Sequence, residues 1–347
     1  MRLRVSRHRH AGLALRGGAA RSCTAVAGGS LLVIALSGAA GAGVFGSAGA
    51  AGPAGAAGPA AAAGPAAAAG PPAAAGPPAA AGPPAAAGPP RYVALGDSYT
   101  AGPLVPDQTG SPAGCLRSTH SYPFLVGTGT GAAAFTDVSC QGATTANMTH
   151  PQSVPLGTNP PQDDALSAGT TLVTLQIGGN NIGFSDIVIH CTTLSLTNPF
   201  GSPCKDHYTS GGTDRLRAKI NAAAPKVAAD LQGIHADAPN ARVLLVGYPA
   251  ILPNSGNGCW PLVPIAFGDV PYLRGVEKAL NAMLVSVAAA NNATFVDTYT
   301  ASVGHDACQA PGTKWVEGLI PTSPAAPFHP NQLGEQGMAR QVLAAVG

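Results

Sequence analysis

Aromatic and charged residues are scarce in this chain, at 5% and 10% of its 347 residues, and only two are tryptophan. Residues 52–90 contain no aromatic, charged or large aliphatic residue at all. Such a stretch has nothing to bury and is not expected to form a core. Long apolar runs are also scarce. The one candidate, residues 31–45, is too short and too glycine-rich for a membrane span, which needs ~20 apolar residues.

The first 51 residues have the layout of a secretory signal peptide. The apolar stretch at 31–45 is followed by small residues at 47–51 and preceded by six arginines, Arg2, Arg4, Arg7, Arg9, Arg16 and Arg21. A basic region, a short apolar core and a small-residue cleavage zone are typical of export. An uncleaved signal anchor is the alternative, because the basic region is long. No second apolar run follows, so we expect no other span.

Residues 52–90 are almost only alanine, glycine and proline, with the repeat Ala-Ala-Ala-Gly-Pro-Pro. The later glycines recur at every sixth position, whereas a collagen helix needs one at every third, so a triple helix is excluded. Repeated Pro-Pro keeps such a chain extended and stiff. We interpret this segment as a spacer of an extracellular protein, long enough to associate the domain that follows with a cell wall.

The remaining residues, 91–347, are long enough for one α/β domain. They hold all 16 acidic residues and 12 of the basic ones, so their formal charge is −4, although the whole chain carries +2. No basic patch favours nucleic acid as a partner.

Cysteines in this part of the chain are even in number, which favours disulfides in an exported domain. They are Cys115, Cys140, Cys191, Cys204, Cys259 and Cys308. Six cysteines allow 15 connectivities, and the sequence alone does not choose among them; pairing in sequence order is our expectation. There is no CxxC pair and no HExxH motif, so we expect no metal site.

Short apolar runs at residues 92–95, 171–177, 242–246 and 294–296, and a weaker one at 135–138, predict buried strands. Apolar stripes of helical spacing alternate with them, over residues 216–234, 273–287 and 333–346. Pro225 should kink or split the first of these helices. Alternation of this kind predicts a parallel sheet in a three-layer α/β/α sandwich, flavodoxin-like in architecture. Functional residues should then lie after the strands, at their carboxyl ends.

The loop after the first predicted strand reads Gly96-Asp97-Ser98-Tyr99-Thr100-Ala101-Gly102. Ser98 follows the strand in a tight turn, where a hydroxyl can stand at the edge of the sheet. The sequence is not the GxSxG motif of α/β-hydrolases, because position 100 is threonine. By itself the tripeptide Gly-Asp-Ser is weak, and Ser98 fits a helix N-cap equally well.

Three further segments make the pattern specific. Val138-Ser-Cys-Gln-Gly-Ala-Thr-Thr145 supplies Gly142, Ile177-Gly-Gly-Asn-Asn181 supplies Asn180, and Pro327-Phe-His-Pro-Asn-Gln-Leu-Gly334 supplies His329. Together with the segment that contains Ser98, these three segments resemble the four conserved sequence blocks of the GDSL or SGNH hydrolase family, and they occur in the same order. The resemblance spans residues 92–347 and is greatest to the secreted bacterial lipase/esterase branch, whose six cysteines are thought to pair in sequence.

The resemblance implies a serine esterase. A serine hydroxyl needs a base within hydrogen-bonding reach, and a histidine can accept its proton and return it to the leaving alcohol. Ser98 would be the nucleophile and His329 the base. The main-chain N–H groups of Ser98 and Gly142 and the side-chain amide of Asn180 would form the oxyanion hole.

Two departures from the family pattern concern the same site. The family often has an acid three residues before the histidine, but position 326 is alanine and no carboxylate lies between residues 320 and 334. We therefore predict that a main-chain oxygen near residues 323–327 orients His329 in a Ser–His dyad; the alternative is a distant acid, Asp306 or Asp297. Asn181 stands where the family usually has aspartate, and the sequence does not say whether the charge is needed.

Other polar residues are interpreted as structural. Asp97 should accept N–H groups of its turn, and the neighbouring Asp163 and Asp164 should cap a helix rather than form an acid pair.

The sequence thus predicts a secreted esterase or lipase that hydrolyses lipid-like acyl esters through an acyl-enzyme, without cofactor or metal. We expect the protein to be a monomer whose partner is its ester substrate, with transient contact with a lipid surface. We expect no binding to nucleic acid. Two alternatives stay open: a polysaccharide O-acetyl esterase, disfavoured by the few aromatics, and a non-catalytic surface-binding module of the same fold.

Overall fold

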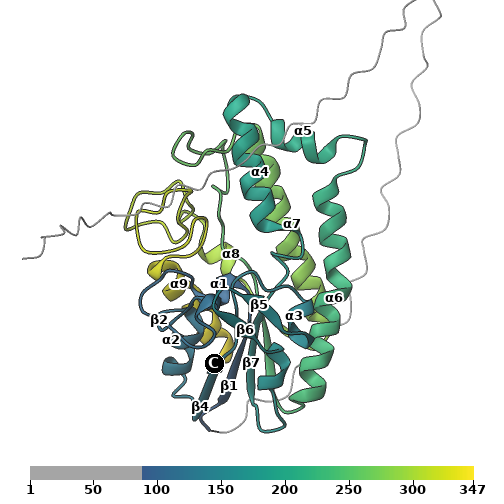
Figure 1. Ribbon diagram of the computed structural model, residues 1–347, viewed down its shortest axis with the longest axis vertical. Coiled ribbons are helices and arrows are strands. Elements are labelled where there is room, and N and C mark those ends of the chain that lie inside the picture. The colour runs from purple at the N-terminus through teal and green to yellow at the C-terminus, as the bar shows by residue number, and fades with distance from the viewer. Residues whose placement is uncertain (1–87) are drawn as a thin grey trace, which may run out of the picture. The chain divides into compact units, whose positions relative to one another are not determined.

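Five parallel strands form the central sheet of the computed structural model, which describes residues 88–347 (Figure 1). The predicted signal peptide and nearly all of the spacer lie outside the described residues. In spatial order the strands are β4 (Ala134–Asp137), β1 (Arg91–Gly96), β7 (Leu172–Gln176), β8 (Arg242–Val246) and β9 (Thr294–Val296). Every neighbouring pair is parallel. All five predicted strands, including the weak one, are confirmed.

Helices cover both faces of this sheet, and the alternation of side chains along β1 separates the two layers. Tyr92 and Ala94 pack with α2 (Tyr122–Gly129) and α9 (Gln332–Val346), whereas Val93 and Leu95 face the core of the opposite layer. That layer contains α4 (Phe184–Thr197), α5 (Pro203–Thr209), α6 (Arg215–Asp237) and α7 (Asp269–Ala290). The predicted three-layer sandwich is therefore confirmed.

Shorter elements lie in the connections. They are α1 (Ser98–Ala101), α3 (Ala146–Thr149), α8 (Thr298–Ala301), the 3-10 turns η1 (Ala113–Cys115) and η2 (Gln162–Ala165), and the hairpins β2–β3 (Gln108–Thr109, Arg117–Ser118) and β5–β6 (Gln152–Val154, Gly157–Asn159). No helix within residues 88–347 is long and apolar enough to cross a membrane.

Two local expectations differ from the structure. Pro225 was expected to kink or split the predicted helix, and a split is ruled out because α6 runs through it from Arg215 to Asp237. The buried stripe of α6, which includes Ala223 and Val227 on either side of the proline, keeps the helix in place. Asp163 and Asp164 cap no helix: they lie within η2, whose N-cap residue is Pro161 and makes no side-chain cap bond.

The six cysteines form three disulfides in sequence order, Cys115–Cys140, Cys191–Cys204 and Cys259–Cys308. The first joins the segment before α2 to the loop after β4. The second joins α4 to α5. The third joins the loop after β8 to the loop after α8. Each disulfide thus ties down a connection on the way to or from the sheet, rather than two strands within it.

Candidate active site

The turn after β1 places Ser98 at the first position of α1, directly beyond the carboxyl end of the strand. Its shape requires a glycine at position 96, where φ is +151° and a Cβ would lie 2.3 Å from the Thr100 hydroxyl. The side chain of Gln162 forms two hydrogen bonds with the main chain of Gly96. It accepts from the Gly96 N–H (2.7 Å) and donates to the Gly96 carbonyl (2.9 Å). Asp97, not Ser98, is the N-cap, since its carboxylate accepts from the Tyr99 N–H.

Ser98 and His329 come together across 231 residues of sequence. The Ser98 Oγ lies 2.8 Å from His329 Nε2. Burial lowers the pKa of His329 to about 4, although the hydrogen bond with the Pro327 carbonyl acts in the opposite direction. The imidazole is therefore neutral at ordinary pH and able to accept a proton from the serine hydroxyl.

A main-chain oxygen orients this imidazole, in the segment where the sequence predicted one. Nδ1 lies 2.8 Å from the carbonyl of Pro327, so a proton on Nδ1 leaves Nε2 free to accept from Ser98. The two alternative acids are engaged elsewhere. Asp306 accepts from the Cys308 N–H and the Gln309 side chain, and Asp297 caps α8.

Hydrogen bonds fix the segment that carries this carbonyl at several points. The Tyr99 hydroxyl donates to the Phe328 carbonyl (2.6 Å), and the Ala326 N–H donates to the Pro103 carbonyl (2.9 Å). The Glu317 N–H donates to the His329 carbonyl (3.0 Å). Phe328 itself has a φ of +59°, a left-handed conformation that a bulky residue keeps only when its surroundings enforce it.

Glu317 is a residue of this site that the sequence interpretation missed. It is fully buried and pairs with Lys314 at 2.9 Å. It also accepts from the Thr322 N–H and from the side chain of Asn331, the N-cap of α9. Burial by itself would raise the pKa of Glu317, but these hydrogen bonds and Lys314 outweigh it and lower the pKa. The sequence carried no signal for this pair beyond its i, i+3 spacing.

The predicted oxyanion donors lie on three segments, and two of these, the Gly142 and Asn180 loops, contact each other. Gly142 has a φ of +74°, and its N–H, like that of Ser98, donates no hydrogen bond within residues 88–347. Asn180 lies after β7 and donates through Nδ2 to the carbonyl of Ala143 (2.9 Å). This bond fixes the amide beside the Gly142 turn and leaves its second N–H for another acceptor.

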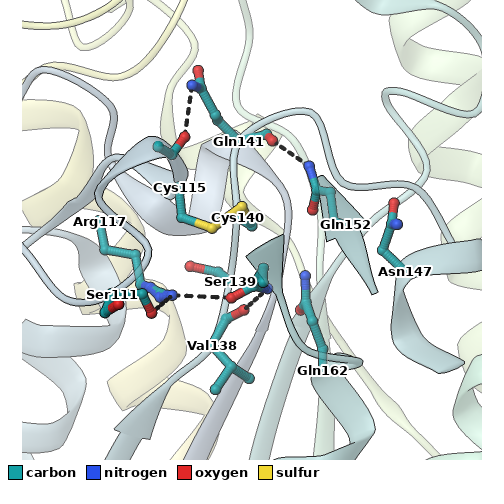
Figure 2. The surroundings of a disulfide bond; sticks show 12 residues. Ser111, Cys115, Arg117, Val138, Ser139, Cys140, Gln141, Asn147, Gln152 and Gln162 are labelled. Atoms are coloured by element: carbon teal, nitrogen blue, oxygen red, sulfur yellow. Dashed lines mark hydrogen bonds between the residues drawn. A yellow bond between two sulfur atoms is a disulfide. The ribbon is translucent and has the colours of Figure 1, made fainter. Parts of the chain in front are cut away.

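Figure 2 shows what holds the Gly142 turn in place. The Cys115–Cys140 disulfide closes it on one side, and the Gln141 side chain donates to the Gly114 carbonyl (2.9 Å). On the other side, Gln152 of β5 donates to the Gln141 carbonyl (2.7 Å). These contacts fix the chain at Cys140 and Gln141, just before the glycine, and the Asn180 bond fixes it at Ala143, just after.

Asn181, the residue that departs from the family pattern, orders the adjoining loop. Its Oδ1 accepts from the Thr145 N–H (3.2 Å), and its Nδ2 donates to the Thr145 hydroxyl (2.7 Å). Both contacts use neutral hydrogen-bonding groups. In this structure, position 181 therefore links two loops without any need for a charge.

A buried network below the serine links its turn to the Asn180 loop. The Tyr248 hydroxyl donates to Asp97 Oδ2 (2.6 Å) and accepts from the Gly179 N–H (2.9 Å). Burial raises the pKa of Asp97 to about 7, while the bonds from Tyr248 and from the Tyr99 N–H lower it. Asp97 thus has the structural contacts expected of it. Tyr248 was missed, although it follows the strand end at Val246, where functional residues were expected.

An apolar cavity opens beside Ser98, between α4, α7 and the loop after β8. Ser98 and Asn180 border it at one end. Most of its wall is aliphatic or aromatic, from Ile182, Phe184, Ile187, Val188, Ile251, Leu252, Ile265, Leu273, Val276, Leu280 and Phe328. Two carboxyls also line it, that of Glu277 on α7 and that of Asp97 next to Ser98 in the turn after β1. A cavity of this composition suits a hydrocarbon chain better than a sugar.

The structure therefore gathers Ser98, His329, Gly142 and Asn180 at one edge of the sheet, where their segments were expected to meet. Within residues 88–347, no other histidine forms a hydrogen bond with any of these four residues. No set of three potential metal ligands occurs in the described part of the chain.

Comparison with known proteins agrees with the motif order. The model of the GDSL-like lipase/acylhydrolase family matches residues 94–336. Lipase 2 of Streptomyces coelicolor is 43% identical over 259 residues, which cover 74% of this chain and 85% of that protein. An esterase of Streptomyces scabiei is 30% identical, over 72% of this chain and 84% of that protein.

Two solved structures have the same fold over all of their own length. Phospholipase A1 from Streptomyces albidoflavus NA297 superposes with a TM-score of 0.62 and 26% identity, and covers 75% of this chain. The extracellular lipase of Streptomyces rimosus gives a TM-score of 0.61 and 27% identity, over 74% of this chain.

Proposed function

The chain belongs to the GDSL-like lipase/acylhydrolase family and is a carboxylic ester hydrolase, and from this premise we propose that it is a secreted serine esterase or lipase for lipid-like acyl esters. One observation carries the proposal. The Ser98 hydroxyl lies 2.8 Å from a neutral His329, and Ser98 lines an apolar cavity. The nucleophile, its base and the space for an acyl chain thus adjoin one another.

The reaction follows from these positions. Ser98 Oγ attacks the ester carbonyl while His329 Nε2 takes its proton, and the imidazolium then protonates the leaving alcohol. The main-chain N–H groups of Ser98 and Gly142, with the second N–H of Asn180, receive the negative charge of the tetrahedral intermediate. A water molecule deprotonated by His329 then cleaves the acyl-enzyme.

The Ser–His pair acts without a carboxylate. The carbonyl of Pro327 keeps the Nδ1 proton in place, which selects the tautomer that the base needs. A carbonyl stabilises the imidazolium less than a buried carboxylate does, so turnover should be modest.

Two features support action outside the cell. The catalytic domain has three disulfides, which persist in oxidising compartments. The segment before it has the basic and apolar pattern of a signal peptide. The alanine-, glycine- and proline-rich segment would hold the domain away from its attachment point in a cell wall.

Contact with a lipid surface is supported by exposed apolar side chains on the segments that wall the cavity. α4 lines the cavity with Ile187 and Val188, yet Ile189 and Leu196 of the same helix are 65% and 69% exposed. Phe200 follows at 79%. A surface helix with apolar groups on two sides is unusual for a protein surrounded only by water.

Ester hydrolysis by the purified protein and its Ser98→Ala variant tests the proposal. With p-nitrophenyl acetate, butyrate, decanoate and palmitate, we expect Ser98-dependent turnover that favours the longer chains. Asn180→Ala should lower kcat by roughly 10²–10³-fold, as expected for a lost oxyanion donor.

A preference for acetate, together with release of acetate from acetylated polysaccharide, would favour the O-acetyl esterase alternative. Turnover that persists in Ser98→Ala would contradict the assigned nucleophile.

A further inference from the structure

Glu277 occupies an unexpected position on the wall of the apolar cavity. α7 borders the cavity through Leu273, Val276 and Leu280, at the i, i+3 and i+7 positions of one helical face. Glu277 is at i+4 of the same series, so the helix directs this carboxyl into its own apolar stripe. A carboxyl in an apolar wall lowers the stability of the folded protein unless its oxygens form hydrogen bonds.

One of those oxygens is accounted for by the protein. Oε1 accepts a hydrogen bond from the Ile251 N–H at 3.0 Å. Oε2 accepts none from residues 88–347, and the ion pair found in that part of the chain joins Lys314 and Glu317 instead. The hydrogen bond from the Ile251 N–H needs only one acceptor oxygen, which a neutral side chain such as glutamine could also provide.

The surroundings keep this carboxyl protonated. Burial raises the pKa of Glu277 to about 8, and Asp306 adds to the rise, while the Ile251 N–H and Lys278 act against it. The phenolic rings of Tyr99 and Tyr299 lie near enough for the Glu277 charge to raise their own pKa values. Lys278 projects over the Tyr299 ring, 5.5 Å from its centre, and forms no ion pair with Glu277. At neutral pH, Glu277 is thus a hydrogen-bond donor in an apolar wall.

We propose that Glu277 forms a polar subsite within the acyl cavity and selects acyl chains that carry an oxygen substituent, a hydroxyl or an oxo group, part-way along their length. This inference rests on the proposed function, because the cavity must receive the acyl chain. A protonated carboxyl donates to either substituent, and the Ile251 N–H already occupies the other oxygen. A plain hydrocarbon chain leaves the donor unpaired, which is the physical basis for discrimination.

Competition between substituted and plain substrates tests the subsite. The substrates are methyl decanoate and its hydroxy and oxo derivatives, with the oxygen moved along the chain, and the released acid is quantified by chromatography. The measured quantity is the ratio of kcat/KM for each substituted ester to that for the plain ester. We expect a maximum at one position of the oxygen. Glu277→Leu should lower that maximum by about two- to tenfold, the worth of one hydrogen bond.

Glu277→Gln is the matched control, since its amide can accept from Ile251 and donate into the cavity. It should keep the maximum. A second measurement needs no variant at all. As the pH rises through about 8, Glu277 loses its proton and can no longer donate to an oxo group, although it can still accept from a hydroxyl. The oxo preference of the wild-type protein should therefore disappear by pH 9.5, whereas the hydroxy preference and both preferences of Glu277→Gln should persist.

The two proposals fail in different ways. Equal ratios in the wild type and Glu277→Leu at every position, or an oxo preference that persists to pH 9.5, would overturn the subsite and leave Glu277 only as the anchor of Ile251. In that case plain methyl decanoate would still be hydrolysed in a Ser98-dependent manner. Absence of that basal hydrolysis would instead overturn the proposed function.

Discussion

Replacement of Tyr248 by phenylalanine removes one hydroxyl that joins two loops of the proposed active site. That hydroxyl donates to Asp97, next to the proposed nucleophile Ser98, and accepts from Gly179, next to Asn180. Asp97 and Tyr248 are 1% and 4% exposed, so bulk water cannot simply take the place of the lost group. The variant keeps the ring and its packing, which restricts the change to hydrogen bonding.

The magnitude follows from the two partners left behind. A buried polar group without its partner costs about 1–3 kcal/mol, so the carboxyl and the N–H together should lower the free energy of unfolding by about 2–6 kcal/mol. For a domain of this size each kcal/mol shifts Tm by roughly 2–4 °C, so Tm should fall by about 4–24 °C. We also expect kcat to fall, because the Ser98 turn and the Asn180 loop lose their shared anchor.

The loss of stability in Tyr248→Phe should depend on pH. The pKa of Asp97 in the folded protein, about 7, is above its ordinary value, so the folded state binds more protons and stability falls as the pH rises through that range. The Tyr248 bond lowers this pKa, and its removal raises the pKa further. The destabilisation should therefore be larger at pH 8.5 than at pH 5.

Thermal unfolding of both proteins at the two pH values provides the assay. Tyr272→Phe is the control, since its hydroxyl also donates to a carboxylate, that of Asp214 (2.9 Å), but at a half-buried position. That variant should change Tm by only a few degrees. A Tm for Tyr248→Phe equal to that of the wild type at pH 8.5 would refute the reasoning that this network joins the two loops.

Three further predictions concern single groups. Because burial lowers the pKa of His329, kcat/KM should decline only as the pH falls towards about 4; a decline centred at 6.5 would contradict the buried base. Asn181→Asp should keep kcat within a few-fold, because an acid still accepts from Thr145, whereas Asn181→Ala should lower kcat by about tenfold; equal loss in both would show that the amide itself is required. Burial, followed by the charge of Asp163, raises the pKa of Asp230 to about 8, so stability falls as the pH rises through that value. Asp230→Asn should then raise Tm by more at pH 9 than at pH 5, and an equal gain at both would exclude titration of Asp230 as the cause.

Much of the fold, and the meeting of Ser98 with His329, could be predicted because the signals are local. The strand before Ser98 is a short apolar run, and the residues after a parallel strand must lie at the carboxyl edge of the sheet. His329 and Asn180 stand in segments with recognisable neighbours. The need for a main-chain orienting group also followed from a local fact, the absence of any acid between residues 320 and 334.

Contacts between distant segments could not be predicted in this way. Gln162 holds Gly96 from 66 positions away, and Tyr248 contacts Asp97 from 151 positions away. A glutamine or tyrosine has no sequence pattern that reveals such a partner. Glu277 has no sequence signal for a different reason, since the apolar stripe over residues 273–287 is recognised from its hydrophobic members and a single carboxyl among them does not alter the pattern.

Because no carboxylate accepts a hydrogen bond from His329 Nδ1, both the orientation and the charge of this histidine depend on other groups of the site. Its orientation depends on the Pro327 carbonyl, whose neighbours are fixed by bonds from Tyr99, Glu317 and Ala326. Its low pKa also means that, in the proposed reaction, the protein stabilises the imidazolium poorly. Stabilisation of the transition state must then come mainly from the proposed oxyanion donors, of which the Gly142 turn is fixed by the Cys115–Cys140 disulfide and Asn180 by its bond to Ala143. Rate in this site should accordingly be more sensitive to the position of those donors than to the basicity of the histidine.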